Sequence, residues 1–336
     1  MVNFFKLMFF NLLIMSTLMS ISALTWFTAW IGLEMNLLAL IPLMKTNSNK
    51  LSAEAAIKYF IIQAMASSSL LFTIILFSNM NLMNMKINTI VSIMMNSALI
   101  LKMGAAPLHF WLPEVVSGLN WKLVWLILTW QKIAPMILLS YCMNSSIFLT
   151  SIIILSTITG GLQGINQTCL RKIMAFSSIN HMGWMLSALM NSSNLWFYYF
   201  FIYTLMNTMI ILLFNKFHLY YLNQLNKILS YNKKLKFMFM MNFLSLGGLP
   251  PFIGFFPKWM TMNFLLKSNF YTLSLILVIF TLIALYFYMR ITFSSFTLDN
   301  KESLINKPVK FKFILFLSNL MSLFSLPLCF AIYSFM

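Results

Sequence analysis

The sequence predicts an all-α membrane protein of about 11 transmembrane helices, and two observations support this fold class. Of the 336 residues, 61% are hydrophobic and only 8% are charged, whereas soluble domains contain roughly 45–50% apolar and about 25% charged residues. A spanning helix needs about 20 mostly apolar residues, so eleven helices leave little chain for an aqueous domain. The composition therefore excludes a water-soluble globular protein.

Eleven apolar segments are long enough to cross a bilayer. They are residues 4–22, 26–44, 55–78, 87–112, 123–142, 147–165, 173–190, 195–214, 237–262, 270–293 and 313–335. Short polar segments separate them, such as Lys45–Lys50, Asn79–Lys86 and Asn191–Asn194. The first segment is a full-length apolar stretch, with no cleavable signal or transit peptide before it. We expect the whole chain, residues 1–336, to form a single transmembrane domain.

The basic residues are distributed unequally between the two sides that these spans define. Of 22 Lys and Arg residues, 17 fall in loops or at span ends on the side of the N-terminus, two (Lys86 and Lys267) on the opposite side, and three well inside spans. An excess of Lys and Arg marks the inner face of a membrane, and only an odd number of crossings gives this asymmetry. We therefore expect the N-terminus inside and Met336 outside. Because the bases are dispersed among apolar runs, the net charge of +17 does not indicate nucleic-acid binding.

Four charged residues lie well inside predicted spans, away from the span ends: Glu34, Lys102, Lys132 and Lys258. A charge at the centre of a spanning helix costs about 2.5–3.5 kcal/mol on insertion scales. One explanation is structural, since lysine side chains can extend to the interface and Glu34 can form an ion pair with a neighbouring lysine. The alternative is a proton relay, because burial favours the neutral form of a lysine and a nearby carboxylate favours the charged form.

Two segments inside spans interrupt the helical pattern. They are KMGAAPLHFWLP, residues 102–113, and LGGLPPFIGFFPK, residues 246–258. A proline lacks an amide hydrogen and clashes with the carbonyl four residues earlier, so Pro107 frees the carbonyl of Met103 and Pro251 frees that of Gly247. Protein groups or water must then bond these carbonyls within the membrane. A simple kink in a packed helix is the other interpretation.

The two interruptions suggest an internal repeat, since they fall five spans apart and each carries one lysine. An odd offset reverses the direction of entry into the membrane, as in the inverted repeats of transporters. We expect pseudo-repeats at about 1–145 and 146–295, followed by a C-terminal helix at about 311–336. The same offset matches the span of Glu34 with the span of His181. Imidazole titrates near neutrality, so His181 is either a relay residue or a hydrogen-bonded core histidine, and His109 is a weaker candidate.

The chain shows no cofactor-binding motif of its own. Cys142, Cys169 and Cys329 are far apart in sequence and form no CxxC pair. No Gly-rich phosphate loop and no Ser/His/Asp array is recognisable, and the aromatic residues are spread along the spans as lipid-facing and interfacial residues usually are. We expect no metal and no redox cofactor in this chain.

Four ordered motifs resemble one family. They are KMGAAPLHFWLPE (102–114), WQKIAP (130–135), RKIMAFSSINHMG (171–183) and GGLPPFIGFFPKW (247–259). Together they are similar to the antiporter-like membrane subunits of NADH:ubiquinone oxidoreductase, respiratory complex I. Relatives from bacteria have fourteen spans, so the first three are missing here, and we expect a neighbouring subunit or lipid to cover the exposed flank.

The resemblance implies a proton-translocating subunit of the membrane arm, with two inverted five-helix repeats. It implies that Glu34 pairs with Lys102, that Lys132 connects the two half-channels, and that Lys258 leads to the exit. It also implies that NADH, FMN, iron-sulfur clusters and ubiquinone bind other subunits, and that the protein lies in the mitochondrial inner membrane with its N-terminus in the matrix and its C-terminus in the intermembrane space.

Two other functions stay open at this point. One is a stand-alone cation/proton antiporter that uses similar buried charges. The other is a structural or assembly subunit whose lysines carry no protons. The short chain, the missing helices and the lack of a large aqueous domain favour dependence on partner subunits over the stand-alone antiporter.

Overall fold

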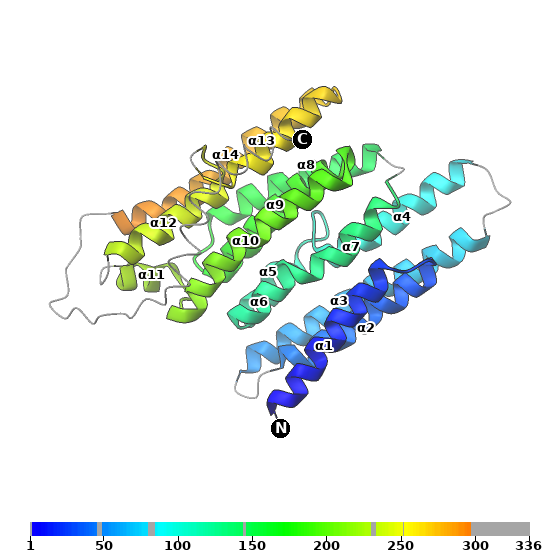
Figure 1. Cartoon of the computed structure of the whole chain (residues 1–336), viewed down its shortest axis with the longest axis horizontal. Helices are drawn as coiled ribbons and strands as arrows, with labels where there is room; N and C mark the ends of the chain where they lie inside the picture. The colour runs from blue at the N-terminus through cyan, green and yellow to red at the C-terminus, as the bar shows by residue number, and fades with distance from the viewer. Residues whose placement is uncertain are drawn as a thin grey trace. The chain divides into compact units, whose positions relative to one another are not determined.

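The computed structural model describes residues 2–45, 49–79, 85–143, 146–229, 233–250 and 252–296, and this part of the chain is almost entirely helical (Figure 1). The first helices are α1 (Val2–Ile21), α2 (Trp26–Met44), α3 (Lys50–Asn79), α4 (Met85–Met103), α5 (Trp111–Gly118), α6 (Trp121–Leu128) and α7 (Trp130–Ser140). They are followed by α8 (Ser146–Ile165), α9 (Leu170–Asn191), α10 (Ser193–Phe217), α11 (Leu222–Leu229), α12 (Lys233–Gly247), α13 (Phe255–Lys267) and α14 (Tyr271–Phe296).

Helices occupy the first ten predicted spans, and the eleventh, residues 313–335, lies outside the described residues together with Cys329 and Met336. Seven helical segments in the described part are long and apolar enough to cross a membrane. The fourth span is divided into α4 and α5 and the ninth into α12 and α13, as the interrupted patterns predicted. The fifth span is also divided, into α6 and α7, which the sequence interpretation did not foresee.

The chain divides into two compact units, residues 1–152 and 153–336. In the first unit, α1 packs along α2, as the blue ribbons of Figure 1 show, and α3 packs against α2, α4 and α5. Helix α7 contacts α1 and α4. In the second unit, α9 packs against α10, α13 and α14, while α12 packs against α10 and α14. The four intramembrane charges divide between these units: Glu34, Lys102 and Lys132 belong to the first, and Lys258 belongs to the second.

Helix α9 is the most deeply buried helix of the second unit, since every residue from Ile173 to Leu189 is buried. A helix that is buried all round needs no amphipathic pattern, and α9 mixes apolar residues with serine, asparagine and histidine. Its hydroxyls are bonded locally: Ser177 Oγ donates to the Met174 carbonyl at 2.8 Å and Ser178 Oγ to the Ala175 carbonyl at 2.7 Å. These bonds remove the cost of burying the hydroxyl groups.

A glycine allows α8 and α9 to approach each other very closely. A β-carbon added at Gly160 would lie 2.5 Å from the backbone nitrogen of Asn180 and 2.9 Å from its Cα atom. Backbone atoms cannot rotate away as a flexible side chain can, so any larger residue at position 160 must push the two helices apart. The position of α9 therefore depends on this contact.

We predict that Gly160→Val destabilises the second unit by about 1–3 kcal/mol, the usual cost of overpacking a well-packed core. The measurement is the thermal unfolding temperature of the protein in its native membrane. Gly247→Ala is the matched control, because the nearest atom to an added β-carbon there is an ordinary 3.6 Å away. Equal unfolding temperatures for the two variants would contradict the close-packing explanation.

Candidate functional site

The first helix interruption is closed by a glycine in the left-handed conformation. Helix α4 ends at Met103, and Gly104 follows with a φ of 73°. The amide of Gly104 donates to the Ile100 carbonyl at 3.0 Å, and the amide of Ala105 donates to the same carbonyl at 3.3 Å. In a Schellman motif, the amide of the second residue after the helix bonds the carbonyl five residues before it, as Ala105 does here. The motif favours glycine directly after the helix.

The second interruption has the same local geometry. Helix α12 ends at Gly247, and Gly248 has a φ of 80°. The amide of Gly248 donates to the Ser245 carbonyl at 3.0 Å, and that of Leu249 to the Leu244 carbonyl at 3.4 Å. Both interruptions are therefore specified helix ends rather than kinks in a continuous helix. Pro251, to which the sequence interpretation assigned the second break, lies outside the described residues.

The last carbonyls of α4 and α12 are bonded by different kinds of donor. At α4, Trp111 Nε1 donates to the Leu101 carbonyl at 3.1 Å, and Gln63 Nε2 donates to the Lys102 carbonyl at 3.2 Å. At α12, Lys258 Nζ lies 3.0 Å from the Gly247 carbonyl and 3.5 Å from that of Leu246. A cation at a helix C-terminus also interacts favourably with the helix dipole. The first break thus has neutral caps, and the second has an ammonium group.

Lys102 is buried in the last turn of α4, with 7% of its surface exposed. Its side chain lines a small cavity together with Leu33, Asn36, Tyr59, Gln63 and Gln131, with Leu37 and Pro135 completing the wall. The cavity has room for about one water molecule, and its polar lining offers the two to four partners that a buried water needs.

Glu34 is partly buried on α2, next in sequence to the cavity residue Leu33. It lies near enough for its charge to act on Lys102. In the described part of the chain, however, no ion pair within 4.0 Å joins the two side chains. The structure therefore brings Glu34 and Lys102 into electrostatic range without direct contact.

Lys132 is almost completely buried, with 1% of its surface exposed. It lies in the first turn of α7, just after the division at Thr129, whose hydroxyl donates to the Trp125 carbonyl at 2.6 Å. The preceding residue, Gln131, lines the Lys102 cavity and donates to Asn36 Oδ1 at 2.8 Å. Lys132 lies near the middle of the predicted span 123–142 and is buried, which does not fit the explanation that it extends to the interface.

Lys258 and His181 belong to the second unit. Besides the two carbonyls, Lys258 Nζ lies 6.0 Å from the centroid of the Trp184 ring, within cation–π range. Trp184 is on α9, one turn after His181. His181 is 3% exposed, its Nδ1 is 3.0 Å from the Tyr199 hydroxyl, and its ring centroid is 5.2 Å from that of Tyr203. This arrangement is compatible with both interpretations of His181, as a relay residue and as a core histidine.

His109 lies within the first interruption, between α4 and α5. It is 2% exposed, its Nδ1 is 3.3 Å from the Pro107 carbonyl oxygen, and its ring stacks on Phe110 at a centroid distance of 4.5 Å. These contacts hold His109 against its own loop. It is absent from the residues that line the Lys102 cavity.

Several polar residues of the site were not singled out from the sequence. They are Asn36, Tyr59, Gln63 and Gln131 around the cavity, Thr129 at the division of α6 from α7, and Tyr199 and Tyr203 beside His181. A usable signal exists for the amides, because Asn and Gln inside a spanning segment are themselves rare and costly. The predicted site was based on charges, histidines and helix-breaking residues alone.

Within the described ranges, no group of three or more His, Cys, Asp or Glu residues is placed to hold a metal ion. Of the cysteines in those ranges, Cys142 is buried and Cys169 is partly buried. The polar groups that do converge are amides, tyrosines and lysines. Their chemistry is that of hydrogen bonding and proton exchange.

The chain is similar to proteins of known membrane complexes. Residues 23–284 match the family described as NADH:quinone oxidoreductase/Mrp antiporter, TM. Two relatives called NADH-ubiquinone oxidoreductase chain 2 are from Locusta migratoria and Anopheles gambiae. The first is 46% identical over 90% of this chain and 88% of its own length. The second is 48% identical over 88% of this chain and 87% of its own length.

Solved structures share the fold at low sequence identity. A chain of respiratory complex I from Thermus thermophilus with bound aureothin has a TM-score of 0.83 and 21% identity, covering 96% of this chain and 80% of that one. A chain of the membrane-bound sulfane sulfur reductase, an archaeal respiratory membrane complex, has a TM-score of 0.85 and 14% identity, covering 97% of this chain and 73% of that one. From these matches together, the chain belongs to the NADH:quinone oxidoreductase/Mrp antiporter transmembrane family.

Proposed function

We propose that this chain is a membrane-arm subunit of a proton-pumping NADH:ubiquinone oxidoreductase and that Glu34, Lys102, Lys132 and Lys258 carry its protons. The observation that carries the proposal is the cavity beside Lys102, with room for about one water and lined by amide side chains. The subunit assignment is supported by relatives named NADH-ubiquinone oxidoreductase chain 2 and by the shared fold of a complex I chain.

In the first unit, the proton steps centre on Lys102. The negative charge of Glu34 favours the ammonium form of Lys102, and the apolar surroundings favour the neutral form. A change in the position of Glu34, or a second positive charge on Lys132, shifts this balance and releases the proton. A water held by Gln63, Gln131 and Asn36 is the natural acceptor, since these amides both donate and accept hydrogen bonds.

In the second unit, Lys258 is the proton carrier, and its ammonium group also bonds the end of α12. His181 is a second-tier relay candidate, because imidazole exchanges protons near neutral pH and Tyr199 is in hydrogen-bond contact with it. His109 is a weaker second-tier candidate, since it contacts its own loop and does not line the cavity. We place NADH oxidation, FMN, the iron-sulfur clusters and ubiquinone in other subunits of the complex.

Two alternatives are separated by measurement. A stand-alone cation/proton antiporter would be stable and active when purified as a monomer in detergent. A structural or assembly subunit would keep the pumping stoichiometry of the complex when its buried lysines are neutralised. The covering of the exposed apolar side chains of α1 by lipid or a neighbouring subunit belongs to the same proposal of dependence on partners.

We predict that Lys132→Met lowers the number of protons pumped per electron pair at least severalfold while the complex still assembles. Methionine keeps the length and apolar stem of the lysine but cannot carry a proton. The measurement is NADH oxidation together with proton uptake in reconstituted vesicles. Lys122→Met is the matched control, because Lys122 is an exposed lysine of the neighbouring α6. Unchanged rate and stoichiometry in Lys132→Met would remove Lys132 from the relay.

We predict different outcomes for two substitutions of Lys258. Arginine keeps a positive charge and its donors for the Gly247 carbonyl, but it does not release a proton in proteins. Lys258→Arg should therefore retain assembly and lose proton pumping. Lys258→Met should lower both, because it also leaves the end of α12 without its charged cap. Assembly is measured on native gels, and normal pumping by Lys258→Arg would show that Lys258 acts only as a cap.

We also propose the orientation, with the N-terminus in the mitochondrial matrix and Met336 in the intermembrane space. It is supported by the 17 basic residues on the side of the N-terminus and the two on the opposite side. We predict that a protease added to mitoplasts removes a C-terminal tag and leaves an N-terminal tag intact. Removal or protection of both tags together would contradict the odd number of crossings.

A further inference from the structure

The short helix α5, which follows the first interruption, runs antiparallel along α3. Its first residue, Trp111, makes an edge-to-face contact with Tyr59 at a centroid distance of 5.8 Å. Further along, Glu114 bonds Lys58. At its end, Gly118 is so close to α3 that an added β-carbon would lie 2.5 Å from the Leu51 carbonyl oxygen. Contacts at three positions along α5 thus hold it against α3.

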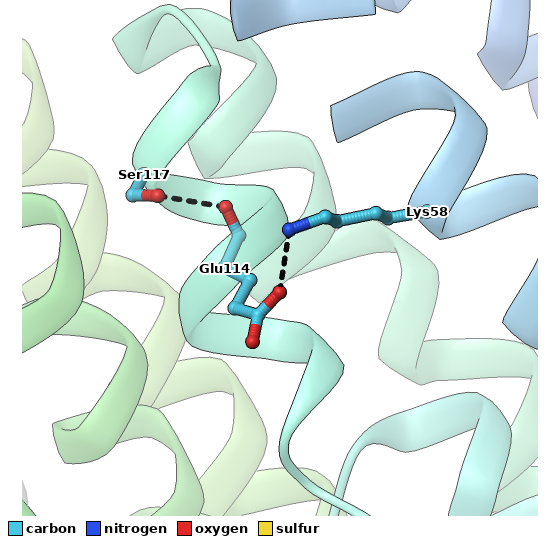
Figure 2. A network of polar contacts seen from close by, with 3 residues as sticks. All are labelled: Lys58, Glu114 and Ser117. Carbon is cyan, nitrogen blue, oxygen red and sulfur yellow. Dashed lines mark hydrogen bonds and ion pairs between the residues drawn. The ribbon is translucent and has the colours of Figure 1, made fainter. Parts of the chain in front are cut away.

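The middle contact is an ion pair that the proton-relay proposal does not use. Lys58 Nζ lies 2.7 Å from Glu114 Oε2, and the two side chains are 52% and 56% exposed. Figure 2 shows the ammonium group reaching from α3 to the carboxylate, with the Ser117 hydroxyl donating to the Glu114 backbone carbonyl at 2.7 Å. An ion pair this exposed contributes little to stability. Its effect is better sought in the position and rotation of α5.

The internal repeat gives Glu114 a counterpart in the second unit. The segments 104–114 and 248–258 both read G-x-x-P, then five residues, then proline and a charged residue. Aligned in this way, Glu114 corresponds to Lys258. In the second unit, that charged residue turns back to bond the end of its own broken helix. In the first unit, it turns outward and bonds α3 instead.

Helix α3 contacts both halves of the first broken helix close to Lys102. Tyr59, next to Lys58, packs on Trp111, and Trp111 Nε1 bonds the Leu101 carbonyl at the end of α4. One turn further along α3, Gln63 bonds the Lys102 carbonyl. Tyr59 and Gln63 also line the cavity that holds the Lys102 side chain. These contacts connect α5, through Trp111, with the turn that carries Lys102.

We infer that Lys58 and Glu114 are positioning residues for Lys102: their ion pair holds α5 in the register on α3 that keeps the capped end of α4 and the Lys102 cavity in place. The inference rests on the proposed function of Lys102, but its structural part can be tested separately. In the first unit, Lys58 and Glu114 together help to fix the end of the broken helix, whereas in the second unit Lys258 alone bonds that end.

The test is a charge-swap cycle in the assembled complex. The variants are Lys58→Met, Glu114→Gln and the double variant Lys58→Glu/Glu114→Lys, with Lys50→Met as the matched control, because Lys50 is an exposed lysine on the same helix. One readout is protons pumped per electron pair. The other is the rate at which a membrane-permeant maleimide labels a Leu33→Cys substitution in the cavity wall, compared with the complex that lacks this cysteine.

We expect each single variant to lower the proton yield and to raise the labelling rate roughly two- to fivefold, the range of a weak ion pair. The swapped pair should restore both readouts, and Lys50→Met should change neither. If a single variant fails to assemble, recovery of assembly by the swap supports the inference, and failure of the swap overturns it. Single variants that assemble with unchanged labelling also overturn it.

Lys102→Met separates this inference from the proposed function. If Lys102→Met abolishes pumping while the Lys58 and Glu114 variants change neither readout, the relay holds and the positioning role is wrong. If Lys102→Met leaves pumping intact but the single variants still raise labelling and the swap restores it, the ion pair positions the end of α4 and the relay assignment is wrong.

Discussion

The structure depends on one constraint, which is that a backbone carbonyl inside the bilayer must find a hydrogen-bond donor within the protein or in an enclosed water. In two of the divided spans, the fourth and the ninth, the interruption exposes the last carbonyls of a helix. Left-handed glycines, Gly104 and Gly248, close the helix ends. Side chains from elsewhere then bond the remaining carbonyls. The polar groups in the interior of these spans are a consequence of these bonds.

The two interruptions solve the same problem with different chemistry. Neutral donors, Trp111 and Gln63, cap α4, so the ammonium group of Lys102 is directed to the cavity and not to the helix end. At α12, the ammonium group of Lys258 is itself the cap. In the proposed relay, loss of a proton from Lys258 removes the charge that interacts with the dipole of α12. Proton release at Lys258 is therefore coupled to the helix end, whereas release at Lys102 can occur with the helix end unchanged.

Much of the fold and of the candidate site could be predicted from the sequence. Charges and prolines in an apolar segment carry a large energetic cost and are therefore conspicuous. The first ten spans, the two interruptions and the four intramembrane charges follow from that cost. The division at Thr129 and the amide partners Asn36, Gln63 and Gln131 were missed. A threonine or an amide can be satisfied by its own helix, so its partner is decided by packing between distant segments. The Lys58–Glu114 pair, 56 residues apart in sequence, was missed for the same reason.

The separation of Glu34 from Lys102 suits the proposed relay, in which Lys102 changes its protonation state. A buried contact pair holds its proton strongly, because breaking it leaves an uncompensated charge in a low dielectric. A carboxylate that acts from beyond contact distance exerts a weaker influence, which a small movement or a second positive charge can offset. The amide-lined cavity beside Lys102 gives the released proton a polar neighbour. An unpaired but electrostatically coupled glutamate is thus better suited to proton transfer than a tight ion pair.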